Sequence, residues 1–87
     1  NSEKEMKKVT IGCAVKERII ELCRQRNITI NKLATNSGVT QSTLNNIISG
    51  RNNSTTVATV KKLCDGLEIT IVEFFDADVF RQLEEIR

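Results

Sequence analysis

Residues 28–49 read Ile-Thr-Ile-Asn-Lys-Leu-Ala-Thr-Asn-Ser-Gly-Val-Thr-Gln-Ser-Thr-Leu-Asn-Asn-Ile-Ile-Ser, and this stretch decides the fold. Apolar and small side chains recur at helical spacing on both sides of Gly38. The pattern predicts two short helices, over residues 30–37 and 41–49, each preceded by a threonine in the N-cap position. Glycine adopts a left-handed backbone at little cost, so we expect Gly38 to form the tight turn between the helices.

The second predicted helix carries an uncharged polar face. Leu44 and Ile47 are expected to tie this helix to a hydrophobic core, which leaves the opposite side chains outside. A helix-turn-helix module presents its second helix in this way to the base edges in the major groove of DNA, where amide side chains can pair with adenine. The predicted base-reading residues are Gln41, Ser42, Asn45 and Asn46, with Thr43 at the edge of the face. The alternative for each of them is a solvated polar side chain.

The composition favours one small helical domain. The chain has 87 residues, only three Phe and no Trp or Tyr, and its apolar residues recur at intervals of three and four. It contains no apolar run of about 18 residues and no visible signal peptide, so we expect a cytoplasmic protein and no membrane span. The charged segment at the N-terminus is interpreted as a loose tail.

The three cysteines are Cys13, Cys23 and Cys64. Their odd number and their places within apolar stripes argue against a disulfide framework and for a reducing compartment. The chain has no histidine and its cysteines are far apart in sequence, so no zinc site, other metal or cofactor is expected. We interpret the thiols as small side chains that fill the core.

The net charge of +2 conceals an uneven distribution. Residues 22–64 contain six basic side chains and no acidic ones, whereas residues 65–87 contain seven acidic and two basic ones. Because the acid-free stretch coincides with the predicted base-reading helix, we interpret it as a surface for a polyanion, with chance clustering as the alternative. The acidic end is expected to point away from that polyanion.

Three further helices are predicted from apolar periodicity and capping residues. They cover residues 11–26, residues 57–65 and a segment that starts at residue 71. Gly66 is expected to stop the second of them, and Thr70 with Glu73 fits a capping box for the third. The chain is then expected to continue as a short helix to Ile86. The predicted organisation is a flexible N-terminal tail (1–9), a DNA-binding domain (10–76) and a C-terminal helical extension (77–87).

With these elements in order, residues 11–75 resemble the lambda-repressor/Cro-like family of phage and bacterial regulators, also called the XRE family. The residues that carry the resemblance are Leu33, Ala34, the segment from Gly38 to Leu44, Ile47, Gly50, Leu63, Leu67, Glu68, Ile69, Thr70, Phe74 and Phe75. The resemblance implies an all-α fold, a five-helix lambda-repressor-like DNA-binding domain with a short C-terminal helical extension. It also implies that Gln41, Ser42 and Asn46 occupy base-reading positions.

Phosphate contacts are expected on both sides of the base-reading face. The helix over residues 30–37 begins with free N–H groups, which suit an anion. The residues at that end are Thr29, Asn31 and Lys32. The resemblance implies a loop after the base-reading helix that grips the DNA backbone. The residues of this loop are Arg51, Asn52 and Asn53.

The chain departs from the family at one pair of positions. Many members join the first and third helices by an Arg–Glu pair, and the corresponding positions here look like Cys23 and Ile48. An apolar contact at this place avoids desolvating two charges, so we expect the fold to be sound without the ion pair.

The resulting hypothesis is a sequence-specific DNA-binding transcriptional regulator that acts as a repressor. It would bind a palindromic double-stranded operator as a homodimer, with residues 41–49 in the major groove. The residues considered for the dimer surface are Phe74, Phe75, Val79, Phe80, Leu83 and Ile86, and the alternative is that they pack on their own domain. The alternative function is a DNA-binding antitoxin or a protein-interaction adaptor of a two-gene module, with a protein partner at the C-terminal extension. Without histidine, paired carboxylates or a Gly-rich phosphate loop, an enzyme is not expected.

Overall fold

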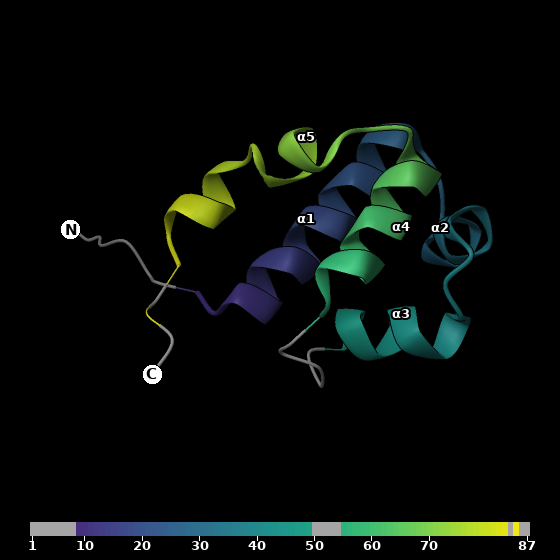
Figure 1. Cartoon of the computed structure of the whole chain (residues 1–87), viewed down its shortest axis with the longest axis horizontal. Coiled ribbons are helices and arrows are strands. Elements are labelled where there is room, and N and C mark those ends of the chain that lie inside the picture. The colour runs from purple at the N-terminus through teal and green to yellow at the C-terminus, as the bar shows by residue number, and fades with distance from the viewer. Residues whose placement is uncertain (1–8, 50–54, 84, 86–87) are drawn as a thin grey trace.

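The computed structural model describes residues 9–49, 55–83 and 85. In these residues the secondary structure is helical apart from one isolated bridge between Val9 and Leu83, which confirms the all-α prediction. The elements are α1 (Ile11–Arg26), α2 (Ile30–Ser37), α3 (Gln41–Ile48), α4 (Val57–Leu67), α5 (Ile71–Phe75) and the 3-10 helix η1 (Asp78–Arg81). α3 lies along one edge of the molecule, and α5 and η1 lie at the opposite edge (Figure 1). None of the helices in the described ranges has the length and hydrophobicity needed to cross a lipid bilayer.

Threonine side chains fix where the α-helices begin. At the start of α1 to α5, the Oγ1 atom of an N-cap threonine accepts a hydrogen bond from the N–H group three residues later. These N-caps are Thr10, Thr29, Thr40, Thr56 and Thr70. At α5 the predicted capping box is complete, because the N–H of Thr70 donates to Glu73 Oε1 at 2.8 Å. Each such cap stabilises its helix by about 1 kcal/mol, and the predicted helix starts are confirmed.

The end of α4 differs from the prediction. We expected Gly66 to stop this helix, but Gly66 lies inside α4, and the helix ends after Leu67 with Glu68 in the left-handed conformation at φ 61°. A Cβ atom on Gly66 would lie 2.1 Å from Oγ and 3.0 Å from Cα of Ser37. The glycine is therefore required by the close approach of α4 to α2, and the prediction that it forms the helix stop is wrong.

The core fixes the two motif helices against the rest of the domain. Leu33 of α2 and Leu44 of α3 are fully buried, and Ile47 of α3 is 1% exposed. The other buried apolar residues include Val15, Ile19, Leu22, Ala34, Val60, Leu63, Cys64, Leu67 and Phe74. Cys23 belongs to the same cluster and Ile48 packs against it, so the positions expected to hold an apolar contact in place of an ion pair are part of this core.

A buried arginine ties α1 to α5. The Arg18 side chain donates from Nε to the carbonyl oxygen of Phe74 at 2.7 Å and from Nη2 to that of Glu73 at 2.6 Å. Its Nη1 atom donates to Glu21 Oε1 at 2.9 Å. Because the last carbonyl groups of a helix have no partners within the helix, the guanidinium of Arg18 satisfies two of them at the end of α5. This role of Arg18 was not predicted, because its partners on α5 lie 55 and 56 residues away in the sequence.

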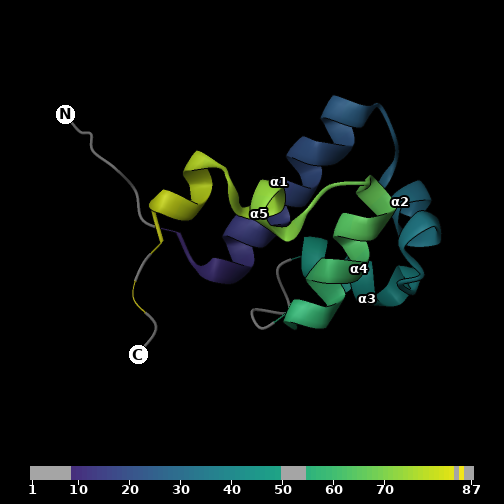
Figure 2. The ribbon, with the colours of Figure 1, turned by 45° about the horizontal axis from the view of Figure 1, so that its top comes forward.

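The C-terminal segment packs back on α1. η1 extends only from Asp78 to Arg81, and Figure 2 shows it beside the beginning of α1. The N–H of Val9 donates to the carbonyl oxygen of Gln82 at 2.8 Å, next to the bridge with Leu83. The predicted continuous helix is thus replaced by one 3-10 turn and an extended contact, because backbone pairing with Val9 competes with further helix formation.

Aromatic contacts hold this segment in place. The ring of Phe80 lies 6.0 Å from that of Phe74 and 4.8 Å from that of Phe75. Phe74 is fully buried, and Phe80 is half-buried against the core. The structure therefore places both rings in intramolecular contacts, whereas Ile86 lies outside the described residues.

Candidate nucleic-acid interface

The polar face predicted for α3 is exposed. Leu44 and Ile47 point this helix's apolar side into the core, and the remaining side chains of its first six residues are all exposed. These residues are Gln41, Ser42, Thr43, Asn45 and Asn46. The helix ends at Ile48, one residue earlier than predicted, where the Ser49 hydroxyl donates to the carbonyl oxygen of Asn46 at 3.1 Å. A short helix held by two buried side chains thus presents an uncharged surface of amides and hydroxyls.

A side-chain hydrogen bond joins the two motif helices at this surface. Nε2 of Gln41, the first residue of α3, donates to Oδ1 of Asn31 near the start of α2. Two residues that were predicted separately, one for bases and one for phosphate, are therefore in direct contact. The bond holds the Gln41 amide in one orientation, since rotating the amide would break it.

The turn between the helices has the predicted geometry. Gly38 follows α2 with φ 71°, in the left-handed region, and its N–H caps α2. Thr40 then accepts a hydrogen bond from the N–H of Thr43 at 3.1 Å, and its hydroxyl donates to Thr43 Oγ1 at 2.8 Å. The hydroxyl of Thr43 is thereby engaged at the edge of the face.

Only some of the N–H groups at the N-terminus of α2 are free to bind an anion. Oγ1 of Thr29 accepts the N–H of Lys32 at 3.0 Å, and the carbonyl oxygen of Thr29 accepts the N–H of Leu33 at 3.0 Å. Within the described part of the chain, the N–H groups of Ile30 and Asn31 are left for a phosphate. The Lys32 side chain is exposed at the same end. The residues predicted for phosphate contact before the turn therefore do lie together.

Arg51, Asn52 and Asn53, predicted to grip the DNA backbone, lie outside the described residues. Their role remains a prediction from the sequence.

Two cations of the acid-free stretch make contacts within the domain. Nε of Arg26 donates to the carbonyl oxygen of Leu67 at 3.0 Å, which ties the end of α1 to the end of α4. Lys61 forms an exposed ion pair with Asp65 one helical turn later. The excess of positive charge that was predicted to face a polyanion is thus partly used within the domain.

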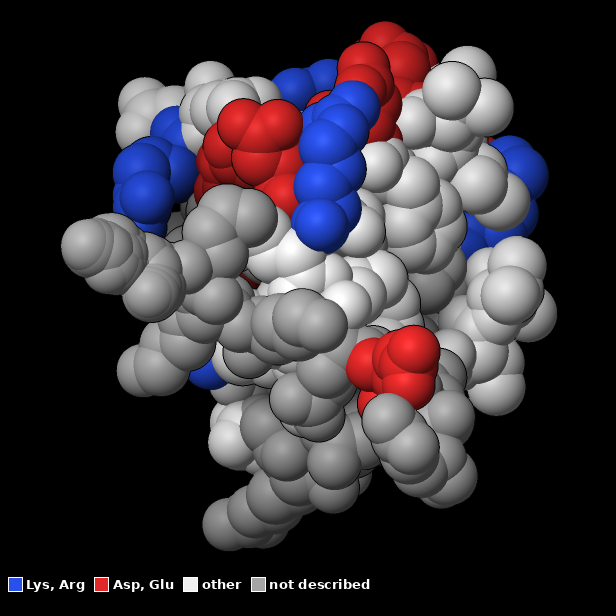
Figure 3. All heavy atoms as spheres, turned by 90° about the vertical axis from the view of Figure 1, so that its left-hand side faces the viewer, with Lys and Arg blue, Asp and Glu red and all other residues white. Residues whose placement is uncertain are grey.

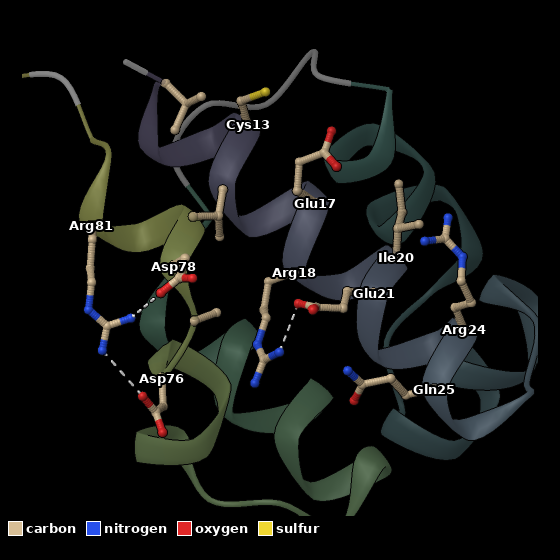
Figure 4. Close-up of a pocket in the computed structure, with 13 residues that line it drawn as sticks. Cys13, Glu17, Arg18, Ile20, Glu21, Arg24, Gln25, Asp76, Asp78 and Arg81 are labelled. Atoms are coloured by element: carbon tan, nitrogen blue, oxygen red, sulfur yellow. Dashed lines mark hydrogen bonds and ion pairs between the residues drawn. The ribbon is translucent and has the colours of Figure 1, made fainter. Parts of the chain in front are cut away.

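A separate cleft lies between α1 and the C-terminal segment (Figure 4). It has a volume of about 970 Å³, and its lining includes Glu17, Arg18, Glu21 and Asp76 but no residue of α2 or α3. Arg81 pairs with Asp78 at 3.0 Å at one end of it. Figure 3 views the molecule from the side on which η1 lies, and basic and acidic side chains stand side by side near the upper edge of that face. The mixture of both signs distinguishes this region from the uncharged surface of α3.

The three thiols have different environments. Cys23 and Cys64 are buried, and burial raises the pKa of both thiols above the ordinary value. Asp65 raises the pKa of Cys64 further, while Lys61 lowers it. Cys13 is half-buried and lines the cleft. Among the described residues, no three side chains of the metal-ligating types lie together.

The family model described as helix-turn-helix matches residues 19–74, which include the whole of α2, α3 and α4. The chain belongs to the XRE-type helix-turn-helix family. The family consists of non-enzymatic DNA-binding regulators, so the exposed polar face of α3 belongs to a DNA-binding domain.

Individual relatives agree with the family assignment. The chain is 42% identical over 62 residues to the HTH-type transcriptional regulator SlrR of Bacillus subtilis (strain 168). The aligned residues cover 70% of this chain. The match spans 41% of the length of SlrR. The chain is also 39% identical to the crystal structure of the prophage Lp1 protein 11, with a TM-score of 0.75 over 85% of this chain and 97% of that one.

A more distant structure shows the fold alone. The wild-type restriction-modification controller protein C.Esp1396I superposes with a TM-score of 0.73 at 19% identity. The superposition covers 86% of this chain and 95% of the controller protein. The five-helix lambda-repressor-like fold expected from the sequence is therefore confirmed.

Proposed function

We propose that this domain binds double-stranded DNA sequence-specifically by inserting α3 into the major groove. The observation that carries the proposal is the exposed, uncharged face of α3 on a helix whose other side is anchored by Leu44 and Ile47. The major groove of B-DNA admits one α-helix, and the N-terminal residues of the helix come nearest to the base edges. Gln41, Ser42, Asn45 and Asn46 are then base-reading residues, with Thr43 at the edge.

The contact between Gln41 and Asn31 supports a coupling between phosphate binding and base reading. Asn31 lies at the end of α2 where its own N–H group and that of Ile30 are left for a phosphate oxygen. A phosphate bound there would fix the position of α2 against the DNA backbone. Because Asn31 is hydrogen-bonded to Gln41, it would also fix the position of the Gln41 amide relative to the bases. Thr29 and Lys32 at the same end would add a hydroxyl and a positive charge. The loop of Arg51, Asn52 and Asn53 would hold the backbone on the far side of α3.

A regulator of this kind would act as a repressor and would bind a palindromic operator as a homodimer in the cytoplasm. One reading helix per half-site requires half-sites about one helical turn apart. For the dimer surface we propose the exposed side of α5, where Val72 is 77% and Phe75 37% exposed. Phe74 and Phe80, also considered for this role, are held in intramolecular contacts and contribute only by supporting Phe75.

The proposal is tested by selecting bound oligonucleotides from a random pool and measuring affinities for the selected site. Asn46→Ala and Gln41→Ala should each lose about 1–3 kcal/mol of binding to the selected site while binding to random DNA is retained. Gln25→Ala is the matched control, because Gln25 is an exposed amide on α1 that lines the cleft instead of the α3 surface. Equal losses on selected and random DNA would remove both residues from the base-reading set.

A further inference from the structure

A stripe of three side chains on α1 faces away from the core of the domain. Glu17, Ile20 and Arg24 follow one another at spacings of three and four residues, so they share one side of the helix. Figure 4 shows them in a row along α1, and all three line the cleft between α1 and the C-terminal segment. Glu17 and Arg24 are exposed, and Ile20 between them is half-buried without belonging to the core of the described residues.

The charges at the two ends of the stripe are free to bind a partner. Among the described residues, the side chain of Arg24 has no ion pair or hydrogen bond. Glu17 has one ion pair, with Lys16 at 3.8 Å, and its side chain is 55% exposed, so this pair contributes little. Glu21, on the same face of α1, pairs with Arg18 at 2.9 Å, which balances its charge within the chain.

The stripe is complementary to a second copy of itself. Glu17 and Arg24 lie seven residues apart, about 10.5 Å along the helix, which is too far for them to pair within one chain. If two α1 helices pack antiparallel about a two-fold axis between residues 20 and 21, Glu17 of each helix lies opposite Arg24 of the other. The two Ile20 side chains then meet next to the axis. We propose that two copies of this chain associate through this antiparallel α1–α1 contact.

A second copy suits the stripe better than a partner of another kind, because one face supplies both members of every ion pair. A two-fold contact repeats each interaction, so it forms two Glu17–Arg24 pairs around one apolar centre. Only one face of one helix is covered, which is much less than the roughly 800 Å² per partner of a standard interface. The association is therefore weak, and its partner choice is set by charge.

This contact differs from the dimer surface proposed on α5. It shares no residue with Val72 and Phe75, and it does not depend on DNA binding by α3. A chain that uses both surfaces at once forms assemblies larger than a dimer. The inference therefore goes beyond the proposed function.

Charge reversal tests the contact in sedimentation velocity over a range of protein concentrations, without DNA. Glu17→Arg and Arg24→Glu each place like charges opposite each other at both ends of the contact, so each variant alone should self-associate about tenfold more weakly than the wild type. An equimolar mixture of the two variants restores opposite charges at both ends and should associate like the wild type. The double variant Glu17→Arg/Arg24→Glu should do the same.

Lys62→Glu is the matched control for these variants. Lys62 is exposed on α4, and its reversal changes the net charge as much as Arg24→Glu does. Association of this variant should equal that of the wild type, and circular dichroism should show that all the variants are folded. A wild-type chain without concentration-dependent association by α1 would give equal sedimentation for all of them. That result, or a mixture that associates no better than its two components alone, would overturn the inference.

A disulfide test locates the axis of the contact. Ile20→Cys in a Cys13→Ser background should form a covalent dimer on mild oxidation, because residues next to the axis of two packed helices are close enough for a disulfide. Thr35→Cys in the same background is the control, since Thr35 is exposed on α2 outside the stripe. Covalent dimers that form as fast through residue 35 as through residue 20, or none through residue 20, would contradict the antiparallel pairing.

Discussion

Gly66 of α4 faces Ser37 of α2 at a distance that leaves no room for a side chain, because a Cβ atom on Gly66 would lie 2.1 Å from Ser37 Oγ. The Ser37 hydroxyl is buried and has no hydrogen-bond partner among the described residues. The two helices therefore meet through a glycine and an unsatisfied hydroxyl, and this contact positions α2 and, through it, the start of α3.

Gly66→Ala should destabilise the domain by about 1–3 kcal/mol, because the added methyl group forces α2 and α4 apart. Denaturant unfolding followed by circular dichroism measures the change. Combining it with Ser37→Ala, which removes the clashing oxygen, should recover part of the loss, and Ser37→Ala alone should cost little since it removes an unsatisfied polar atom. Strictly additive effects of the two substitutions would show that the residues do not meet.

Arg18→Ala should cost about 1.5–3 kcal/mol of stability, because the carbonyl groups of Glu73 and Phe74 lose a charged donor. Backbone hydrogen exchange should become faster in α5 and η1 than in α3. Arg24→Ala is the control, since Arg24 is exposed on the same helix and its loss should change stability by less than about 0.5 kcal/mol. Uniform loss of protection over all helices would contradict a specific link to α5.

Glu68→Gly should stabilise the domain by about 1 kcal/mol, because Glu68 ends α4 with φ 61° and a side chain is strained there. Thermal unfolding would show a higher midpoint. Glu68→Ala keeps a Cβ atom and should give no such gain, so an equal rise for both variants would mean that the loss of charge, and not the backbone, is responsible.

Val72→Asp should weaken the proposed dimer, because it places a charge on an exposed apolar part of α5 without touching the core. Sedimentation equilibrium without DNA measures the effect. Val57→Asp is the matched control, since Val57 is 71% exposed on α4, outside the proposed surface. If the wild-type domain is monomeric and both variants sediment like it, the α5 dimer is refuted.

Cys13 should react with a thiol reagent much faster than Cys23 and Cys64, which are buried with raised pKa values. The two buried thiols keep their protons to higher pH in the folded state than in the unfolded state. Their contribution to stability is therefore present below the ordinary thiol pKa and is lost as pH rises above it. Mass spectrometry of briefly labelled protein would contradict this assignment if Cys23 or Cys64 were modified first.

Local features of the sequence were sufficient for most of the fold. Threonine caps and apolar periodicity predicted where the α-helices begin and which side of α3 is exposed, because both depend on residues within a few positions of each other. The function of Gly66 was misinterpreted because it depends on Ser37, on a different helix. Arg18 was missed for the same reason, since its partners at residues 73 and 74 are distant in the sequence.

The candidate site was predicted to a similar degree. Its residue types and their common face followed from helical spacing, but the hydrogen bond between Asn31 and Gln41 requires the angle between α2 and α3, which the core sets. The course of the extension up to Leu83 also depended on tertiary contacts, because backbone pairing with Val9 and the edge-on packing of Phe80 against Phe75 compete with a helix.

The backbone contact between Val9 and the Gln82–Leu83 segment has a practical consequence. The contact brings the two ends of nearly the whole described chain together. Donor and acceptor dyes attached beside these residues are therefore close enough for efficient energy transfer in the native protein. Unfolding separates those ends to random-coil dimensions. A single-molecule recording of the dye pair would thus follow folding in real time, on the side of the molecule away from α2.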